Sequence, residues 1–160
     1  MSSEVVLAGG KRTPFGDFGK SLKDIEGNKL AEHAASACLE DAGLGVDKID
    51  HLVCGNTLPV DQGGLFSARV VALNIGMAEE SQALNVTRAC GTGTQAIVSA
   101  AEQIMTGHSQ IALAGGYESY SRAPYVSTES RWGGKRGPIT MIDSLDYAYR
   151  DPFNLELMGE

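Results

Sequence analysis

Cys90 is the residue of this sequence best placed to do chemistry. It follows a short apolar run at 83–86 and precedes Gly91 and a segment with helical periodicity, so we expect a thiol at the N-terminus of a helix. The unpaired backbone N–H groups and the positive dipole end of such a terminus favour an anion, which makes a thiol nucleophilic. A thiolate forms and leaves acyl intermediates readily, so a thioester or another activated acyl group suits it. Its own backbone N–H can help to hold the oxyanion.

Two other interpretations of this stretch remain open. A cysteine at the start of a helix can simply pack, without a chemical role. In addition, residues 91–96 match the G-x-G-x-x-A pattern of dinucleotide-binding folds, between a strand and a helix. That pattern needs an acidic residue at the end of the next strand to bind the ribose, whereas this strand ends in Ala-Gly-Gly at 114–116 and Glu118 comes later. Nucleotide binding is therefore the weaker interpretation.

A nucleophilic cysteine usually needs a base, and the sequence offers only three histidines, His33, His51 and His108. His108 lies beyond the far end of the expected helix, about 20 Å from Cys90 at a helical rise of about 1.5 Å per residue, which is too far. His33 lies among polar residues early in a helix, and His51 alternates with apolar strand neighbours, so we expect both at the surface. The sequence thus shows a nucleophile without an evident base.

A second chemical feature is a local excess of positive charge at 121–137, in a chain of formal net charge −7. Such a loop could bind the phosphates of a ligand such as coenzyme A, or it could be a solvated surface. Arg136 is our candidate for binding substrate. The segment carries four basic residues and one acidic residue, namely Arg122, Arg131, Lys135, Arg136 and Glu129.

The elements that must position Cys90 alternate between strands and helices. The order predicts an α/β layered fold with a largely parallel sheet, and the stripe of small residues on the last helix predicts that this helix is central and buried. Short apolar runs predict strands at 5–8, 49–54, 83–86 and 111–114. Apolar residues at helical spacing, each run followed by a glycine, predict helices at 28–42, 64–75 and 93–106.

From residue 121 onward this periodicity fails. Forty irregular residues at the end of a compact domain are hard to justify unless they form a lid, a binding loop or part of a domain that continues. We therefore expect two parts, with 1–120 as an α/β domain that carries the nucleophile and 121–160 as the beginning of a loop region. We also expect the chain to be incomplete.

Composition narrows the class of protein. The 160 residues are 42% hydrophobic and 21% charged, as in an ordinary globular domain. The negative net charge argues against general binding to nucleic acid or to anionic membranes. A run of about eighteen apolar residues occurs nowhere, so we expect no membrane span and no signal peptide, and a cytoplasmic location. Three widely spaced cysteines, Cys38, Cys54 and Cys90, fit neither a disulfide framework nor a C-x-x-C site.

Four stretches of the sequence carry a family resemblance. They are Arg-Thr-Pro-Phe-Gly at 12–16, Asn-Val-Thr-Arg-Ala-Cys-Gly-Thr-Gly at 85–93, Ala-Gly-Gly-Tyr-Glu-Ser-Tyr-Ser at 114–121 and Leu-Met-Gly-Glu at 157–160. In this order they resemble the N-terminal part of a thiolase, an acetyl-CoA acetyltransferase or 3-ketoacyl-CoA thiolase. The resemblance implies a thiolase-type half-domain with a mostly parallel mixed sheet and a buried nucleophile helix. It also implies that residues 121–160 begin the irregular loop region that helps to cover coenzyme A in the family.

The resemblance also implies a chemistry. Cys90 would accept an acyl group from acyl-CoA or 3-ketoacyl-CoA, in thiolytic cleavage or in condensation of acetyl-CoA, as part of fatty acid metabolism. Met158 and its neighbours would line the acyl pocket, and the coenzyme A thioester would be a substrate, with no separate cofactor. A histidine and a second cysteine would activate the thiol from Gly-His-Pro and Cys-x-Gly motifs in the second half of a thiolase; this sequence has neither motif. Thiolases are homodimers or homotetramers, and the pairing would use the strand that leads to the nucleophile.

The sequence departs from the family pattern at three positions. Thr92 and Thr94 stand where serine and an apolar residue are usual, and Leu157 stands where many thiolases have histidine. Two further hypotheses remain: the chain alone is a non-catalytic fragment or half-subunit that needs a second chain, or it belongs to a related condensing enzyme such as a ketoacyl or hydroxymethylglutaryl-CoA synthase. The stretch at 114–119 favours a thiolase over such a synthase.

Overall fold

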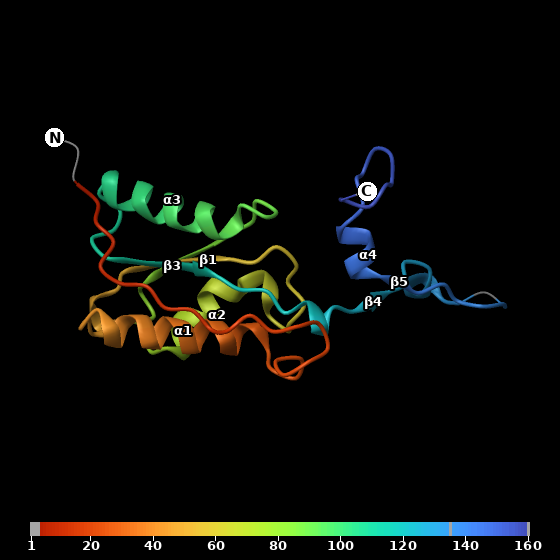
Figure 1. Ribbon diagram of the computed structural model, residues 1–160, viewed down its shortest axis with the longest axis horizontal. Coiled ribbons are helices and arrows are strands. Elements are labelled where there is room, and N and C mark those ends of the chain that lie inside the picture. Colours follow the sequence, from red (N-terminus) through yellow and green to blue (C-terminus); the bar gives the residue numbers. More distant parts are fainter. Residues whose placement is uncertain (1–3, 135, 160) are drawn as a thin grey trace.

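A three-stranded parallel sheet lies at the centre of the fold (Figure 1). The structure, a computed structural model, describes residues 4–134 and 136–159. The strands are β1 (His51–Gly55), β2 (Gln82–Val86) and β3 (Ala112–Gly116), in the order β2-β1-β3, and both neighbours run parallel to β1. Because each connection between these strands passes through a helix, the predicted α/β fold with a largely parallel sheet is confirmed.

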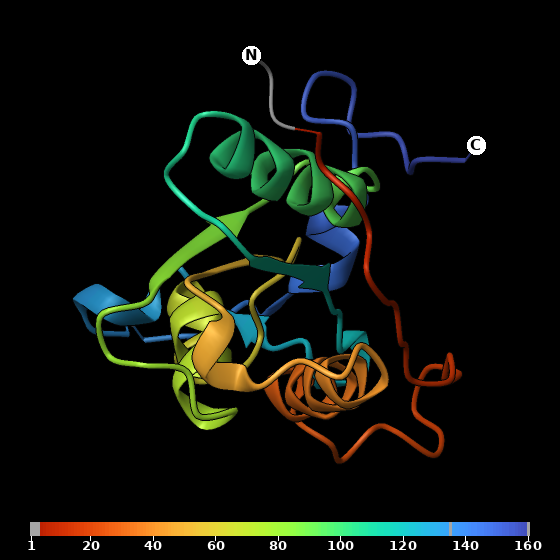
Figure 2. The ribbon, with the colours of Figure 1, turned by 90° about the vertical axis from the view of Figure 1, so that its left-hand side faces the viewer.

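Helices cover both faces of this sheet (Figures 1 and 2). They are α1 (Gly27–Asp41) and α2 (Ser67–Asn74) on one face and α3 (Thr92–Met105) on the other. The glycines expected to end them, Gly43, Gly76 and Gly107, all have positive φ, the left-handed conformation that glycine adopts without strain. Within residues 4–134 and 136–159, no helix is long and apolar enough to cross a membrane.

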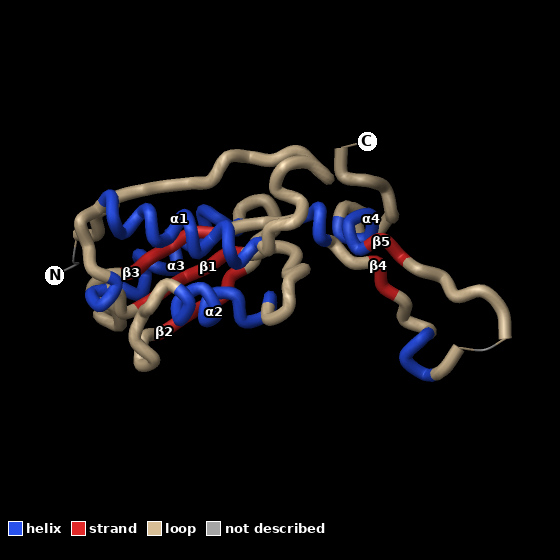
Figure 3. The backbone as a smooth tube through the Cα atoms, turned by 90° about the horizontal axis from the view of Figure 1, so that it is seen from below, coloured by secondary structure: helices blue, strands red, loops and turns tan. Residues whose placement is uncertain are grey.

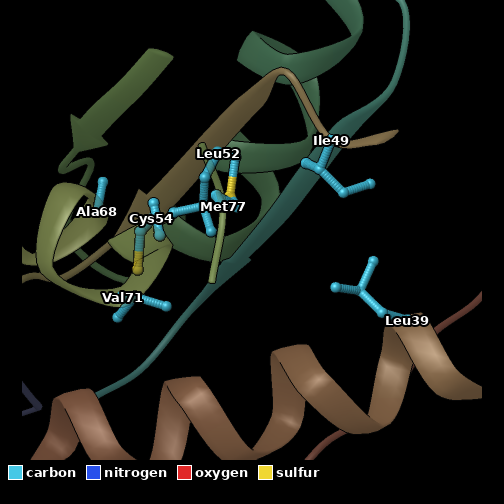
Figure 4. Packing of buried hydrophobic residues seen from close by; sticks show 8 residues of the cluster. Leu39, Ile49, Leu52, Cys54, Ala68, Val71 and Met77 are labelled. Atoms are coloured by element: carbon cyan, nitrogen blue, oxygen red, sulfur yellow. The ribbon is translucent and has the colours of Figure 1, made fainter. Parts of the chain in front are cut away.

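The central strand supplies apolar side chains to both faces of the sheet. Leu52 and Cys54 belong to the larger core cluster with Val71 of α2, as Figure 4 shows, whereas Val53 packs with Ala96 of α3. All five residues of β1 are buried, as expected for a parallel strand that is covered on both sides. This buried strand fixes the position of the helices on either side.

Helix α3 is buried on one face only, which differs from the expectation of a central buried helix. Ala96 and Ala100 are buried against Val53, but Ile97 and Met105 are exposed. Small residues permit close packing on several sides without requiring it, so the stripe could not show how many sides are covered. In this structure the helix that follows Cys90 forms an outer layer.

The N-terminal segment differs most from its predicted structure. Residues 5–8 form no strand, and Val6 and Leu7 are exposed. Among the described residues no strand pairs with this segment, so its apolar side chains have no ladder to complete. Figure 2 shows the segment as an extended chain, in red, that runs past the layers.

The helix predicted at 64–75 has a different first turn. It begins with the 3₁₀ helix η2 (Gly64–Phe66), and regular α-helix follows only from Ser67. Leu65 is therefore 76% exposed instead of lying on the buried face. The tighter winding of a 3₁₀ turn rotates side chains away from the stripe that an α-helix would give them.

Residues 120–159, which we call the C-terminal segment, extend away from the layers (Figures 1 and 3). β4 and β5 pair antiparallel, and the Asp143 carboxylate caps α4 by accepting a hydrogen bond from the Leu145 backbone N at 2.9 Å. The lack of sustained periodicity in the sequence corresponds to short elements. They are η3 (Tyr120–Arg122), β4 (Tyr125–Val126), η4 (Ser130–Trp132), β5 (Ile142–Asp143) and α4 (Ser144–Ala148).

Candidate active site

Cys90 lies on a strained turn between β2 and α3. Its side chain is exposed, and α3 begins two residues later, so the predicted position of the thiol before a helix is confirmed. Ala89 has a φ of 44°, in the left-handed region that residues with a Cβ rarely adopt. Two backbone bonds close the turn, from Gly91 N to Arg88 O at 2.9 Å and from Thr92 N to Ala89 O at 3.1 Å. Such strain persists only where the surroundings hold it.

The Thr92 side chain holds this turn from the inside. Its hydroxyl accepts a hydrogen bond from Arg88 N at 2.7 Å and donates one to Ala89 O at 2.7 Å. The Thr57 hydroxyl lies 3.2 Å from the same Ala89 oxygen and 3.2 Å from the Thr92 hydroxyl. A Cβ added at Gly55 would lie 2.5 Å from the Thr92 methyl carbon, so the bare backbone of Gly55 makes room for that threonine.

Glu118 connects the end of β3 to the loop after β1. Its carboxylate accepts hydrogen bonds from the backbone N of Thr57 and, at 3.3 Å, from that of Leu58. Asn56 also donates its side-chain N–H to Tyr117 O at 3.0 Å. Sequence reasoning noted Glu118 as an acid misplaced for ribose binding and as part of the 114–121 stretch, and it assigned Glu118 no role in the site. The signal that could have found it is its place at the carboxyl edge of a parallel sheet, where segments that follow different strands meet.

A cavity of about 790 Å³ lies against this turn. Cys90 and Met158 both line it, together with Tyr120 and Tyr149, whose rings meet edge to face at 5.9 Å. Met158 donates its backbone N–H to Tyr149 O at 2.8 Å, and its side chain is exposed. Burial raises the pKa of Tyr120, so its phenol keeps its proton at neutral pH. The structure thus brings two sequence-predicted site residues to one cavity.

Among the described residues of the C-terminal segment, no basic side chain lines this cavity. Arg136 is exposed and is not among the residues that line it. Arg122 donates to the buried carboxylate of Asp61 at 2.9 Å, so this guanidinium has a structural partner. Lys135 lies outside the described residues. The role of Arg136 in substrate binding therefore stays a prediction.

The histidines offer no base to Cys90. His33 and His108 are exposed as expected, and His108 follows the opposite end of α3. The expectation of a surface position for His51 was wrong: it is 4% exposed, because β1 is covered on both faces. Burial lowers the pKa of His51 and favours its neutral form. Among the described residues that line the cavity, none is a histidine.

The other two cysteines are also free thiols. Cys38 is half-buried on α1, and Cys54 is buried in the larger core cluster. Burial raises the pKa of the Cys54 thiol to about 12, so it stays protonated at neutral pH and packs as a small apolar side chain. Nor do the described parts of the chain contain a group of three or more side chains that could hold a metal ion.

Sequence comparisons place these features in a family. The sequence matches the family described as "Thiolase, N-terminal domain" over residues 5–160. It is 40% identical over 159 residues to beta-ketothiolase BktB of Cupriavidus necator, and the aligned region covers 99% of this chain and 40% of that protein. It is 38% identical over 142 residues to the mitochondrial 3-ketoacyl-CoA thiolase of Homo sapiens, and the aligned region covers 88% of this chain and 36% of that protein.

Solved structures agree with the sequence match. Human mitochondrial 3-ketoacyl-CoA thiolase, alone and in complex with CoA, is similar with a TM-score of 0.90 and 36% identity over 94% of this chain and 38% of that one. Bacillus anthracis acetyl-CoA acetyltransferase gives a TM-score of 0.89 and 30% identity over 97% of this chain and 39% of that one. The chain spans about two-fifths of the length of these relatives. It belongs to the thiolase family and corresponds to the N-terminal portion of its members.

Proposed function

We propose that this chain is the nucleophile-bearing part of a thiolase, which transfers an acyl group between coenzyme A thioesters through an S-acyl intermediate on Cys90. The observation that carries the proposal is an exposed thiol that lines a cavity, on a strained turn directly before α3. Relatives of this chain are named beta-ketothiolase and acetyl-CoA acetyltransferase, which supports the same chemistry.

The proposed acylation step uses groups of this chain. The Cys90 thiolate attacks the thioester carbonyl carbon, a new C–S bond forms, and the carbonyl π electrons move to oxygen. When the oxyanion collapses, the bond to coenzyme A breaks and coenzyme A leaves as a thiolate, so the acyl group stays on Cys90. The backbone N–H of Cys90 would stabilise the oxyanion, and the positive end of the α3 dipole would stabilise the thiolate.

We propose that the groups that move protons come from the second half of a thiolase. None of the described histidines lines the cavity, and Cys54 keeps its proton at neutral pH. The chain by itself therefore accepts an acyl group from a thioester without completing thiolysis or condensation. A second chain, or a longer form of this one, would supply the histidine and second cysteine that the family resemblance implies.

Several further features belong to the same proposal. Met158 would contact the acyl chain, since it lines the cavity with Cys90, and Arg136 would bind phosphate groups of coenzyme A. No separate cofactor is proposed.

Chains would pair through β2, an edge strand of the sheet in which Leu84 is exposed. We predict a cytoplasmic location, although the human relative is described as mitochondrial.

Acetylation by acetyl-CoA tests the proposal on this chain. After incubation with acetyl-CoA, mass spectrometry of peptides should find an acetyl group on Cys90. Cys90→Ala should lose this adduct, whereas Cys38→Ala, which removes another free thiol, should keep it. Equal labelling of wild type and Cys90→Ala would overturn the proposal. Steady release of product from acetoacetyl-CoA by the chain alone would contradict the inferred lack of a base. Analysis of the products formed from acetyl-CoA would distinguish a thiolase from a hydroxymethylglutaryl-CoA synthase.

A further inference from the structure

We infer that Thr57 and Glu118 are positioning residues for the Cys90 thiol: Glu118 places Thr57, and the Thr57 hydroxyl, with that of Thr92, holds the strained turn at 88–92. This inference rests on the proposed role of Cys90 as a nucleophile. It concerns residues that contact neither the sulfur nor any group placed in the acylation step. Its consequence is a measurable property of the thiol itself.

The strained residue of the turn is also the residue that receives most of the hydrogen bonds. The Ala89 carbonyl accepts from Thr92 N at 3.1 Å, from the Thr92 hydroxyl at 2.7 Å and from the Thr57 hydroxyl at 3.2 Å. A left-handed alanine is strained, and such a conformation persists only where neighbouring bonds hold it. These donors therefore keep Cys90 facing the cavity from a turn that would otherwise relax.

Thr57 comes from a different part of the chain and needs its own support. It follows β1 in a loop 32 residues from Ala89, and its hydroxyl has one proton to share between the Ala89 oxygen and the Thr92 hydroxyl. Figure 1 shows why these segments can meet: β1 and β3 end at the side of the layers where α3 begins. The loop must hold Thr57 at this junction for the bond to form.

Glu118 supplies that support. Its two carboxylate oxygens accept hydrogen bonds from two consecutive backbone N–H groups, Thr57 and Leu58, and bonds to an ionised acceptor are stronger than neutral ones. Because both oxygens are engaged by backbone donors, we assign Glu118 to positioning and not to proton transfer. Thr92 is buried and Glu118 is partly buried, so water competes weakly for the bonds that these two side chains make, whereas the bond from the Thr57 hydroxyl to Ala89 O is exposed.

The pH dependence of Cys90 alkylation by iodoacetamide tests this inference. Loss of the Thr57 hydroxyl in Thr57→Val, which keeps the shape of the side chain, should slow alkylation at neutral pH by about fivefold, as loss of one hydrogen bond would predict. The alkylation rate should be lower across the whole pH profile, because the thiol would no longer be held facing the cavity from the start of α3. Thr57→Ser, which keeps the hydroxyl, should restore the wild-type profile. Thr94→Val, at an exposed threonine in the first turn of α3, is the matched control and should leave the profile unchanged.

A second variant keeps the inference testable if Thr57→Val unfolds. Glu118→Gln can accept from only one of the two backbone N–H groups through its single carbonyl oxygen, and it should shift the alkylation profile in the same direction. A lower melting temperature with an unchanged alkylation profile in both folded variants would overturn the inference. Iodoacetamide contains no coenzyme A, so it tests the thiol independently of acyl transfer. If the alkylation profile shifted in the variants but acetyl-CoA did not acetylate Cys90, the proposed function would be wrong and the positioning role would stand.

Discussion

The layered body, residues 27–119, and the C-terminal segment, residues 120–159, are stabilised in different ways. The body has two clusters of buried apolar side chains on the two faces of its sheet. In the C-terminal segment none of the described residues is buried, and local bonds such as the Arg150–Asp146 ion pair at 2.8 Å determine its shape. Because burial of apolar surface is the main stabilising force in folding, the two parts should differ in their sensitivity to mutation.

The two parts are joined by a buried carboxylate. Asp61 accepts hydrogen bonds from the backbone N of Gly27, at the start of α1, at 2.7 Å and from Arg122 Nε, in the C-terminal segment, at 2.9 Å. Its side chain is 1% exposed, whereas that of Arg122 is 32% exposed. The junction is thus an ion pair with one fully buried partner, in contrast to the exposed Arg150–Asp146 ion pair in the C-terminal segment.

The largest effect should come from Asp61→Ala. This change leaves the Arg122 guanidinium and the Gly27 N–H without their acceptor, and loss of a buried charged acceptor costs about 3 kcal/mol. Urea unfolding measures the loss. The matched control is Asp146→Ala, which removes the carboxylate of an exposed Asp–Arg pair and should not change the unfolding midpoint measurably. Equal destabilisation by both changes would contradict the distinction between the junction and the segment beyond it.

A smaller effect is expected from Val71→Ala in the layered body. Val71 is 2% exposed and packs in the larger core cluster, so removal of its methyl groups should cost about 2 kcal/mol. Val126→Ala truncates a valine of β4 that is 41% exposed and should cost less than about 0.5 kcal/mol. Chemical denaturation of the two variants compares the two regions with the same substitution. A similar cost at both sites would show that β4 is covered in solution.

The pH dependence of stability should come partly from His51, inside the body. Burial lowers its folded pKa, so below the unfolded value of about 6.5 the unfolded state binds more protons than the folded state. Stability from the neutral form is therefore present above that pH and is lost as the pH falls through the window below it. Urea midpoints between pH 8 and 5 should fall less steeply for His51→Gln than for wild type. His33→Gln, at an exposed histidine, should leave the slope unchanged.

The sequence predicted features that depend on neighbouring residues better than features that depend on distant parts of the chain. The helix ends were predictable because Gly43, Gly76 and Gly107 adopt a conformation that few other residues tolerate. The strand predicted at 5–8 is absent. A strand forms only where a neighbouring strand can pair with it, and the local sequence does not show whether such a neighbour exists. The buried position of His51 was also missed, because alternation cannot show that both faces of a strand are covered.

In the candidate site too, the feature set by neighbouring residues was predicted and the contacts between distant residues were not. Cys90 was predictable because its helix and its flanking glycine are neighbours in sequence. The bonds from Thr57 and Leu58 to Glu118 span 61 and 60 residues, and no local pattern predicts a contact of that separation. Sequence reasoning therefore located the candidate nucleophile, and it missed the residues whose hydrogen bonds hold the turn of Cys90.

The smallest effect should be the most direct test of the difference between the two regions. Trp132 is the only tryptophan of the chain, lies in η4 of the C-terminal segment and is 87% exposed. Its fluorescence should change little on urea unfolding, while far-ultraviolet circular dichroism, which is dominated by the helices of the layered body, should show a cooperative transition. A fluorescence transition that coincides with the loss of helix would mean that the indole is packed against the folded body. In that case the C-terminal segment would share the stability of the layers, and the contrast between the two regions would be wrong.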